Sequence, residues 1–187
     1  MRFGRDAVKL PMRVLIIGIN HQIQPSDILS WSSSGALERF ERGQKDAFAE
    51  LIQSRIEERD VQYVAEESKH GQQSVAERCC RCMGLRYENV EMPEARRAAL
   101  GIPPGYAEDD RIPRVEKVRF HEIREHYMVD AMLGSAQGAD SAILICGREH
   151  SQALADSLTS KGHAVEISDL KDQNWYIEDW QSHMLRL

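Results

Sequence analysis

Several kinds of feature are missing from this sequence, and each absence excludes a class of protein. No apolar run approaches the roughly 18 residues of a membrane-spanning helix, and residues 1–13 carry no apolar core of a signal peptide. A phosphate-binding loop is also missing, because the segment after Gly18 lacks the second and third glycines of a dinucleotide-binding motif. The 24 basic residues are outnumbered by 30 acidic ones, which gives a net charge of -6. We therefore expect a cytoplasmic protein that binds neither membranes nor nucleic acids.

Cysteine is scarce as well. Three of the four cysteines crowd together as Cys79, Cys80 and Cys82. Cysteines this close do not easily bridge one another, and there is no second cysteine pair to complete a zinc site. We expect reduced thiols that are packed on, or partly exposed along, a helix.

The composition that remains is that of an ordinary globular domain, with 42% hydrophobic and 29% charged residues in a chain of 187. Short apolar runs alternate with longer amphipathic segments along the chain. This alternation predicts a single α/β domain with a mostly parallel sheet and helices on both of its faces. We expect an N-terminal extension over residues 1–12, the domain over 13–170 and a C-terminal tail over 171–187. The tail carries Trp175, Tyr176 and Trp180, and we expect it to fold back onto the domain.

The expected elements follow from two periodicities. Continuous or alternating apolar patterns predict strands over residues 13–18, 61–67, 85–92, 141–147 and 163–170. Apolar spacing of three and four predicts helices over residues 34–60, 71–84, 93–105, 115–138 and 148–162. Gly43 is expected to bend or break the first helix. The polar stretch 106–117 is expected to be an exposed loop.

Two Gly-x-x-His motifs stand where predicted strands end. Gly18 and His21, with Asn20 between them, follow the first strand, and Gly147 and His150 follow the fourth. A glycine lets the chain turn sharply there or lets a ligand approach closely. Because parallel strands bring their carboxyl ends to one edge, where ligands bind, we expect both histidines to share a pocket. The alternative is two unrelated histidines in surface loops.

Two acidic residues, Glu66 and Glu67, end the second predicted strand. The strand alternation does not decide which of them faces the ligand edge. Glu66 is slightly preferred, because it continues the face of Val64. The alternative is that either carboxylate caps the next helix or lies in solvent.

Arg124 lies on an apolar stripe of the fourth predicted helix, between Phe120 and Met128. A charge on such a stripe needs a partner, so we expect it to contact Glu66, Glu67 or an anionic group of a substrate. Otherwise only its stem packs and its head reaches water. Two neighbours on the same helix, His121 and Glu125, are four residues apart. We expect them to be solvated, and the alternative is a pair behind the site.

The order of these motifs resembles one superfamily, which comprises the TraB/TIKI proteins, the erythromycin-esterase-like hydrolases and the ChaN-like haem-binding lipoproteins. The resemblance covers residues 13 to about 150, and the matching residues are Gly18, His21, Glu66 or Glu67, Arg124, Gly147 and His150. It implies a hydrolase-like site built from two histidines, a glutamate and an arginine. Members of the superfamily include metalloproteases, esterases that need no metal, and binding proteins.

We therefore predict a hydrolase of unknown small-molecule or peptide substrate at the carboxyl edge of the sheet. The expected catalytic residues are His21, Glu66, Glu67, Arg124 and His150, and the expected binding residues are Gly18, Asn20, Gly147 and Glu125. A metal-free site is preferred, and the alternative is a divalent metal held by His21, Glu66 and His150. Two other functions stay open. One is a non-catalytic ligand-binding or sensor domain that acts with a partner protein, and the other is an assembly module or homodimer that uses the aromatic tail.

Overall fold

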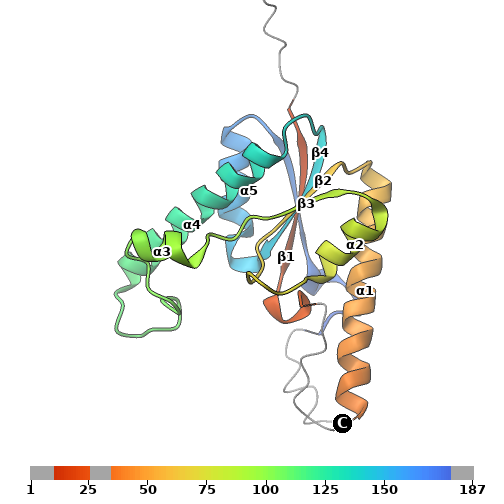
Figure 1. The fold of residues 1–187 in the computed structure, drawn as a ribbon, viewed down its shortest axis with the longest axis horizontal. Helices are drawn as coiled ribbons and strands as arrows, with labels where there is room; N and C mark the ends of the chain where they lie inside the picture. Colours follow the sequence, from red (N-terminus) through yellow and green to blue (C-terminus); the bar gives the residue numbers. More distant parts are fainter. Residues whose placement is uncertain (1–10, 26–34, 178–187) are drawn as a thin grey trace, which may run out of the picture.

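The structure is a computed structural model of the 187-residue chain, and it describes residues 11–25 and 35–177. Its strands are β1 (Arg13–Ile19), β2 (Tyr63–Glu66), β3 (Arg86–Asn89), β4 (Ser141–Gly147) and β5 (Ala164–Asp169) (Figure 1). Its helices are α1 (Gly35–Arg59), α2 (Val75–Met83), α3 (Glu94–Ala99), α4 (Arg114–Ser135) and α5 (Ser151–Ser160), with 3₁₀ turns η1 (His21–Ile23), η2 (Arg148–His150) and η3 (Leu170–Asp172). Every predicted strand and helix is present, which confirms the α/β fold.

All pairings in the five-stranded sheet are parallel, in the order β3-β2-β4-β1-β5. The two central strands, β1 and β4, are paired along their whole length, with Gly18 opposite Cys146 and Ile19 opposite Gly147. Apart from the first residue of β1, both strands are buried on both faces. This explains why each reads as a continuous apolar run instead of an alternating one.

Helices cover both faces of the sheet, with α1 and α2 on one side and α4 and α5 on the other (Figure 1). Successive residues of β1 point to opposite layers: Leu15 and Ile17 pack with the α1 layer, whereas Val14 and Ile16 pack with the α4 layer. The chain moves outward from β1 to β3 and then returns to β4 and β5. Crossovers between parallel strands are right-handed. Helices that connect strands while the chain moves outward therefore lie on one face of the sheet, and helices on the return lie on the opposite face.

This topology creates a divergence at the carboxyl edge. The connection after β4 leads into α5, whereas those after its neighbours β1 and β2 lead to α1 and α2 on the other face. The segments that leave adjacent strands therefore separate, and a crevice at such a point is the usual ligand site of an open parallel sheet. Figure 1 shows this edge at the lower end of the sheet, next to η1.

A small third core supports the part of α4 that projects beyond the sheet (Figure 1). Met92, Ile102 and Tyr106 are buried there, and the ring of Tyr106 lies edge-on to Phe120 with centroids 5.3 Å apart. The prediction of an exposed loop over 106–117 is therefore wrong at its start and at its end. Tyr106 is only 4% exposed, and α4 already begins at Arg114.

Of the bend or break predicted at Gly43, the break is absent, since α1 is continuous from Gly35 to Arg59. A glycine inside a helix costs only about 1 kcal/mol relative to alanine. Burial of a large apolar side chain contributes about 1.5–3 kcal/mol, and Phe48, Ile52 and Ile56 of α1 are all buried. The packing of this helix against the sheet therefore outweighs the local preference of one residue.

The described part of the tail lies against the α1 layer. Trp175 and Tyr176 pack beside the core there, and the Gln44 amide donates a hydrogen bond of 2.7 Å to the Trp175 carbonyl. Trp180 and the first ten residues of the expected extension lie outside the described residues. In the portion of the chain that the structure describes, no helix is long and apolar enough to cross a membrane.

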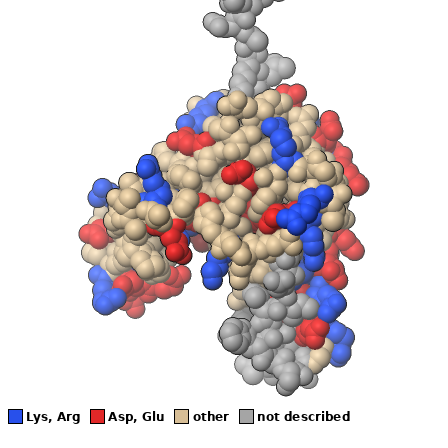
Figure 2. All heavy atoms as spheres, viewed as in Figure 1, with Lys and Arg blue, Asp and Glu red and all other residues tan. Residues whose placement is uncertain are grey.

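Figure 2 shows acidic and basic side chains interspersed over the visible face of the molecule. No broad basic surface is present among the residues coloured on that face.

Candidate functional site

His21 lies at the carboxyl end of β1, in the 3₁₀ turn η1. The Asn20 side chain starts this turn by accepting a hydrogen bond of 3.1 Å from the Gln22 backbone N–H. Asn20 thus has a local structural contact, in the manner of an N-cap. The turn holds the His21 side chain at the edge of the sheet, where it is exposed.

The protonation pattern of His21 follows from its neighbour Gln24. The Gln24 Nε2 donates to Glu66 Oε1 at 3.0 Å and to the Glu67 carbonyl at 2.6 Å, and both of these atoms are acceptors. The amide orientation is therefore determined, and its oxygen Oε1 faces His21 Nδ1 at 2.6 Å. Because an amide oxygen only accepts, Nδ1 carries the proton. Nε2 of neutral His21 consequently holds a lone pair, and it has no hydrogen-bond partner among the described residues.

The glycines of both motifs permit close approach between segments. A Cβ added at Gly147 would lie 2.8 Å from His21 Nε2 and 2.9 Å from Glu149 Oε1. A Cβ at Gly18 would lie 2.7 Å from Ser151 Oγ. Gly147 therefore lets the His21 imidazole rest against the end of β4, and Gly18 lets the start of α5 pack on β1.

Glu67, and not Glu66, faces the two histidines. Its Oε1 accepts from Arg124 at 2.7 Å and its Oε2 accepts from the Gly147 backbone N–H at 2.9 Å. Glu67 thereby joins the carboxyl ends of β2 and β4 to helix α4. The slight preference for Glu66 is wrong, because strand β2 ends at Glu66 and the chain turns at the next residue.

Glu66 instead points toward α2 and is completely buried. Its carboxylate accepts hydrogen bonds from Gln24, from Ser74, the N-cap of α2, and from the Tyr87 hydroxyl at 2.7 Å. Burial raises the pKa of Glu66 to about 7, although these hydrogen bonds oppose the rise. Glu66 therefore does not contact His21 directly but helps to orient the Gln24 amide, which does.

Arg124 has the acidic partner that the sequence predicts, together with two partners that it does not. Its Nη2 contacts Glu67 at 2.7 Å and Glu91 at 2.6 Å, and its Nη1 donates to the Tyr106 hydroxyl at 3.2 Å. The arginine side chain is 12% exposed and the two carboxylates are 3% and 8% exposed, so the network is largely desolvated. Glu91 lies near the end of the third predicted strand (85–92), just as Glu66 and Glu67 lie at the end of the second (61–67), and that position was the available signal.

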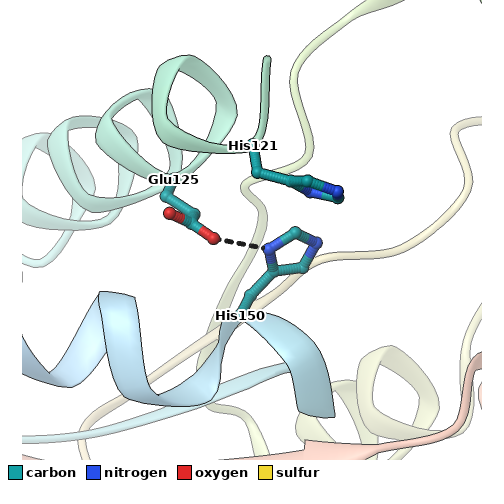
Figure 3. A group of neighbouring side chains, drawn as sticks. All are labelled: His121, Glu125 and His150. Atoms are coloured by element: carbon teal, nitrogen blue, oxygen red, sulfur yellow. Dashed lines mark hydrogen bonds and ion pairs between the residues drawn. The ribbon is translucent and has the colours of Figure 1, made fainter. Parts of the chain in front are cut away.

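His150 is buried behind this network, in the turn η2. Its Nδ1 lies 2.8 Å from Glu125 Oε1, and its Nε2 lies 3.6 Å from Glu67 Oε1 and 3.8 Å from Glu149 Oε1. Burial lowers the pKa of His150, but the hydrogen bond to Glu125 and the charge of Glu67 outweigh it, so the net shift is upward. The ring of His121 lies 5.1 Å from the His150 ring, between centroids (Figure 3).

His121 and Glu125 are thus placed against His150, as Figure 3 shows, and they are only half-buried. The Tyr106 hydroxyl lies 3.0 Å from His121 Nδ1, while Arg124 donates to the same hydroxyl. The preferred prediction that these two residues are solvated is therefore wrong in part, because each of them lies against His150. Tyr106 was missed entirely, because its stretch was expected to be an exposed loop.

An open cavity of about 230 Å³ gives access to part of this constellation. Its lining comprises His21, Glu67, Ser68, Lys69, His70, Glu91, Glu94, Arg97 and Arg124. A second cavity of about 190 Å³ shares His21, Ser68 and Lys69 with it. Of the predicted catalytic residues, His21, Glu67 and Arg124 therefore line the cavity, whereas His150 and Glu66 lie behind it.

The predicted metal ligands do not converge. Glu66 is turned toward α2, away from His150, and both oxygens of Glu67 are already occupied by Arg124 and Gly147. Within residues 11–25 and 35–177, one group of potential ligands has its donor atoms all within 4.8 Å of one another, and it comprises His121, Glu125 and His150. The set His21, Glu66 and His150 thus does not fit a metal ion.

Comparisons of the chain with models of protein families, with curated proteins and with solved structures gave no match. The superfamily resemblance of the two Gly-x-x-His motifs therefore stays a prediction.

Proposed function

We propose that this protein is a metal-free hydrolase of a small-molecule or peptide substrate, with His21 as the general base. The observation that carries the proposal is the state of His21. Gln24 Oε1 holds the Nδ1 proton, and the exposed His21 side chain lines a cavity that Glu67 and Arg124 also line. A general base needs this combination of a determined tautomer, an exposed imidazole and room for a substrate.

The reaction takes place in two proton transfers. His21 Nε2 removes a proton from a water molecule as the water oxygen bonds to the carbonyl carbon of the substrate. The bond from that carbon to the leaving oxygen or nitrogen then breaks, and His21 returns the proton to the leaving group. General base and acid catalysis of this kind contributes about 10²–10⁴ in rate.

Positive charge near the cavity stabilises the oxyanion that forms on the carbonyl oxygen. Arg124, Arg97 and Lys69 all line the cavity. Glu67 and Glu91 hold Arg124 through Nη2, so the guanidinium is positioned before a substrate arrives. Glu67, and His150 behind it, are positioning residues in this scheme.

The test is an assay of protein purified without a histidine tag against panels of carboxylic esters, amides and phosphoesters. The substitution His21→Ala should lower kcat by about 10²–10⁴. The matched control is His126→Ala, an exposed histidine on α4 whose Nδ1 contacts only the Glu122 carbonyl, and it should leave kcat unchanged.

A second variant separates the tautomer argument from the mere presence of the imidazole. Gln24→Leu keeps the His21 ring but removes the acceptor that holds its Nδ1 proton, so kcat should fall while KM changes little. Full activity of His21→Ala would end the proposal. Ligand binding without turnover by the unmodified chain would favour the alternative of a ligand-binding domain.

A further inference from the structure

We propose that His121, Glu125 and His150 form a binding site for one divalent transition-metal ion of the Zn²⁺ type. None of the three residues lines the His21 cavity, although His150 also lies 3.6 Å from Glu67, and the metal site does not depend on the proposed hydrolase function. The three side chains come from two segments, the middle of α4 and the turn after β4. Glu125 points at His150, and the ring of His121 lies over the ring of His150 (Figure 3). Their donor atoms all lie within 4.8 Å of one another.

The donor set selects the class of metal. Two imidazole nitrogens and one carboxylate oxygen suit Zn²⁺, Co²⁺ and related ions, whereas Mg²⁺ and Ca²⁺ prefer sets made of oxygen alone. Three protein ligands leave a fourth position for water or another ligand. The nearest thiols do not contribute, because the free cysteines are not part of this group.

The scaffold that carries the ligands is rigid. His121 and Glu125 are four residues apart and therefore share one face of α4. The following turns of this helix are anchored in the core by Met128 and Met132, which are completely buried. His150 is itself 1% exposed and follows directly on the central strand β4.

Each of the two histidines has a polar neighbour on its other ring nitrogen, as histidine ligands in metal sites usually do. The Nε2 of His150 lies 3.6 Å from Glu67 Oε1, so a carboxylate stands behind the imidazole while Nδ1 faces Glu125 at 2.8 Å. The Tyr106 hydroxyl contacts His121 Nδ1 at 3.0 Å. Carboxylates and hydroxyls in these positions orient histidine ligands and make them more basic. An ordinary ion pair of Glu125 and His150 would not require a second histidine beside it.

The experiment uses the full chain without a histidine tag, stripped with a chelator and titrated with Co²⁺. We expect visible d–d absorption that saturates at one ion per chain and is displaced by Zn²⁺, with the Zn²⁺ content confirmed by elemental analysis. Each of His121→Ala, Glu125→Gln and His150→Ala should weaken Co²⁺ binding by at least about tenfold, since even supporting groups change metal affinity by 10–100-fold. Circular dichroism establishes that each variant is folded.

Two controls make the result specific. His126→Ala and Glu122→Gln change an exposed histidine and an exposed glutamate on the same helix, and neither should alter Co²⁺ affinity. Zn²⁺ should raise the Tm of the unmodified chain and of His126→Ala, but not that of His121→Ala, because only a native-state site stabilises the fold.

The two proposals fail separately. His21→Ala should lower kcat by about 10²–10⁴ and leave Co²⁺ affinity unchanged. An unmodified chain that binds Co²⁺ but hydrolyses none of the substrates supports the metal site alone. Absence of saturable Co²⁺ binding would overturn the metal site. So would equal binding by the unmodified chain and all three ligand variants, which would mean that the three residues form only a hydrogen-bonded cluster.

Discussion

The buried carboxyl of Glu66 makes the stability of the protein depend on pH in a predictable direction. Burial raises its pKa from an ordinary value of 4.5 to about 7, against the opposing hydrogen bonds from Ser74, Tyr87 and Gln24. Between these two pH values the folded chain keeps a proton that the unfolded chain has lost. The free energy of unfolding therefore falls as the pH rises through this window.

The magnitude follows from the two pKa values. Each pH unit between them is worth about 1.4 kcal/mol, so ionisation of Glu66 removes about 3 kcal/mol of stability by pH 8. This contribution is fully present below pH 4.5 and is lost as the pH rises through 7. Other groups also titrate, so the test compares two proteins instead of reading one profile.

The perturbation is Glu66→Gln, which keeps the size of the side chain and removes its ionisation. The substitution has a constant cost, because an amide cannot accept every hydrogen bond that the carboxyl receives. We expect the stability gap between the natural chain and the variant to shrink by about 2.5 kcal/mol between pH 5 and pH 8.5, because the loss has already begun at pH 5. Urea unfolding at half-unit pH steps measures this gap.

The control for this experiment is Glu88→Gln, which changes an exposed glutamate on the adjacent strand β3. Its effect on the free energy of unfolding should be small and the same at every pH. A constant gap between the natural chain and Glu66→Gln from pH 5 to 8.5 would refute the argument that Glu66 ionises at an unusually high pH.

The remaining predictions concern packing and accessibility. Arg124→Met should lower the free energy of unfolding by about 3–5 kcal/mol, because Glu67 loses its arginine partner and Glu91 keeps the more distant Arg97, at 3.7 Å. Arg119→Met on the exposed face of α4 should change it by less than about 0.5 kcal/mol, and equal effects of the two variants in urea unfolding would contradict the buried network. Gly147→Ala should leave the fold nearly unchanged but lower the rate of hydrolysis at least tenfold, because the new Cβ lies 2.8 Å from His21 Nε2. Full activity of this variant would argue against that contact. In the native protein a thiol reagent should modify Cys82 rapidly and the other three cysteines slowly, because only Cys82 is exposed and burial raises the pKa of the others. Mass spectrometry counts the labelled thiols, and rapid labelling of more than one would contradict this prediction.

Most of the fold could be predicted from the sequence, because each apolar pattern fits either a strand or a helix and not both. The runs that form β1 and β4 are too short and too β-branched for helices, and the spacing in α1 and α4 is clearly helical. Gly43 shows the limit of local reasoning. The helix preference of one residue is small compared with the burial of three large side chains further along α1.

The site could be predicted only in part, for a geometric reason. Parallel strands bring their carboxyl ends to one edge, so the segments that hold His21, Glu67 and His150 could be expected to meet. Which of Glu66 and Glu67 faces that edge depends on the last residue of β2, and strand ends are poorly determined by sequence. His121 was difficult to assign because its importance comes from His150, which is distant in the chain and adjacent in space.

The order of strands in the sheet also has a consequence for how the chain acquires its structure. The partners of β1 are β4 and β5, both of which are encoded after residue 140, whereas β2 pairs with β3 soon after both are made. During synthesis the first strand therefore stays unpaired until β4 and β5 have left the ribosome. Contacts between such distant segments slow folding, so insertion of β4 between β1 and β2 is the step we expect to limit its rate. A nascent chain that stops before Ser141 should hold only the β2–β3 pair of this sheet, with the segment that becomes β1 still exposed to aggregation or to chaperones.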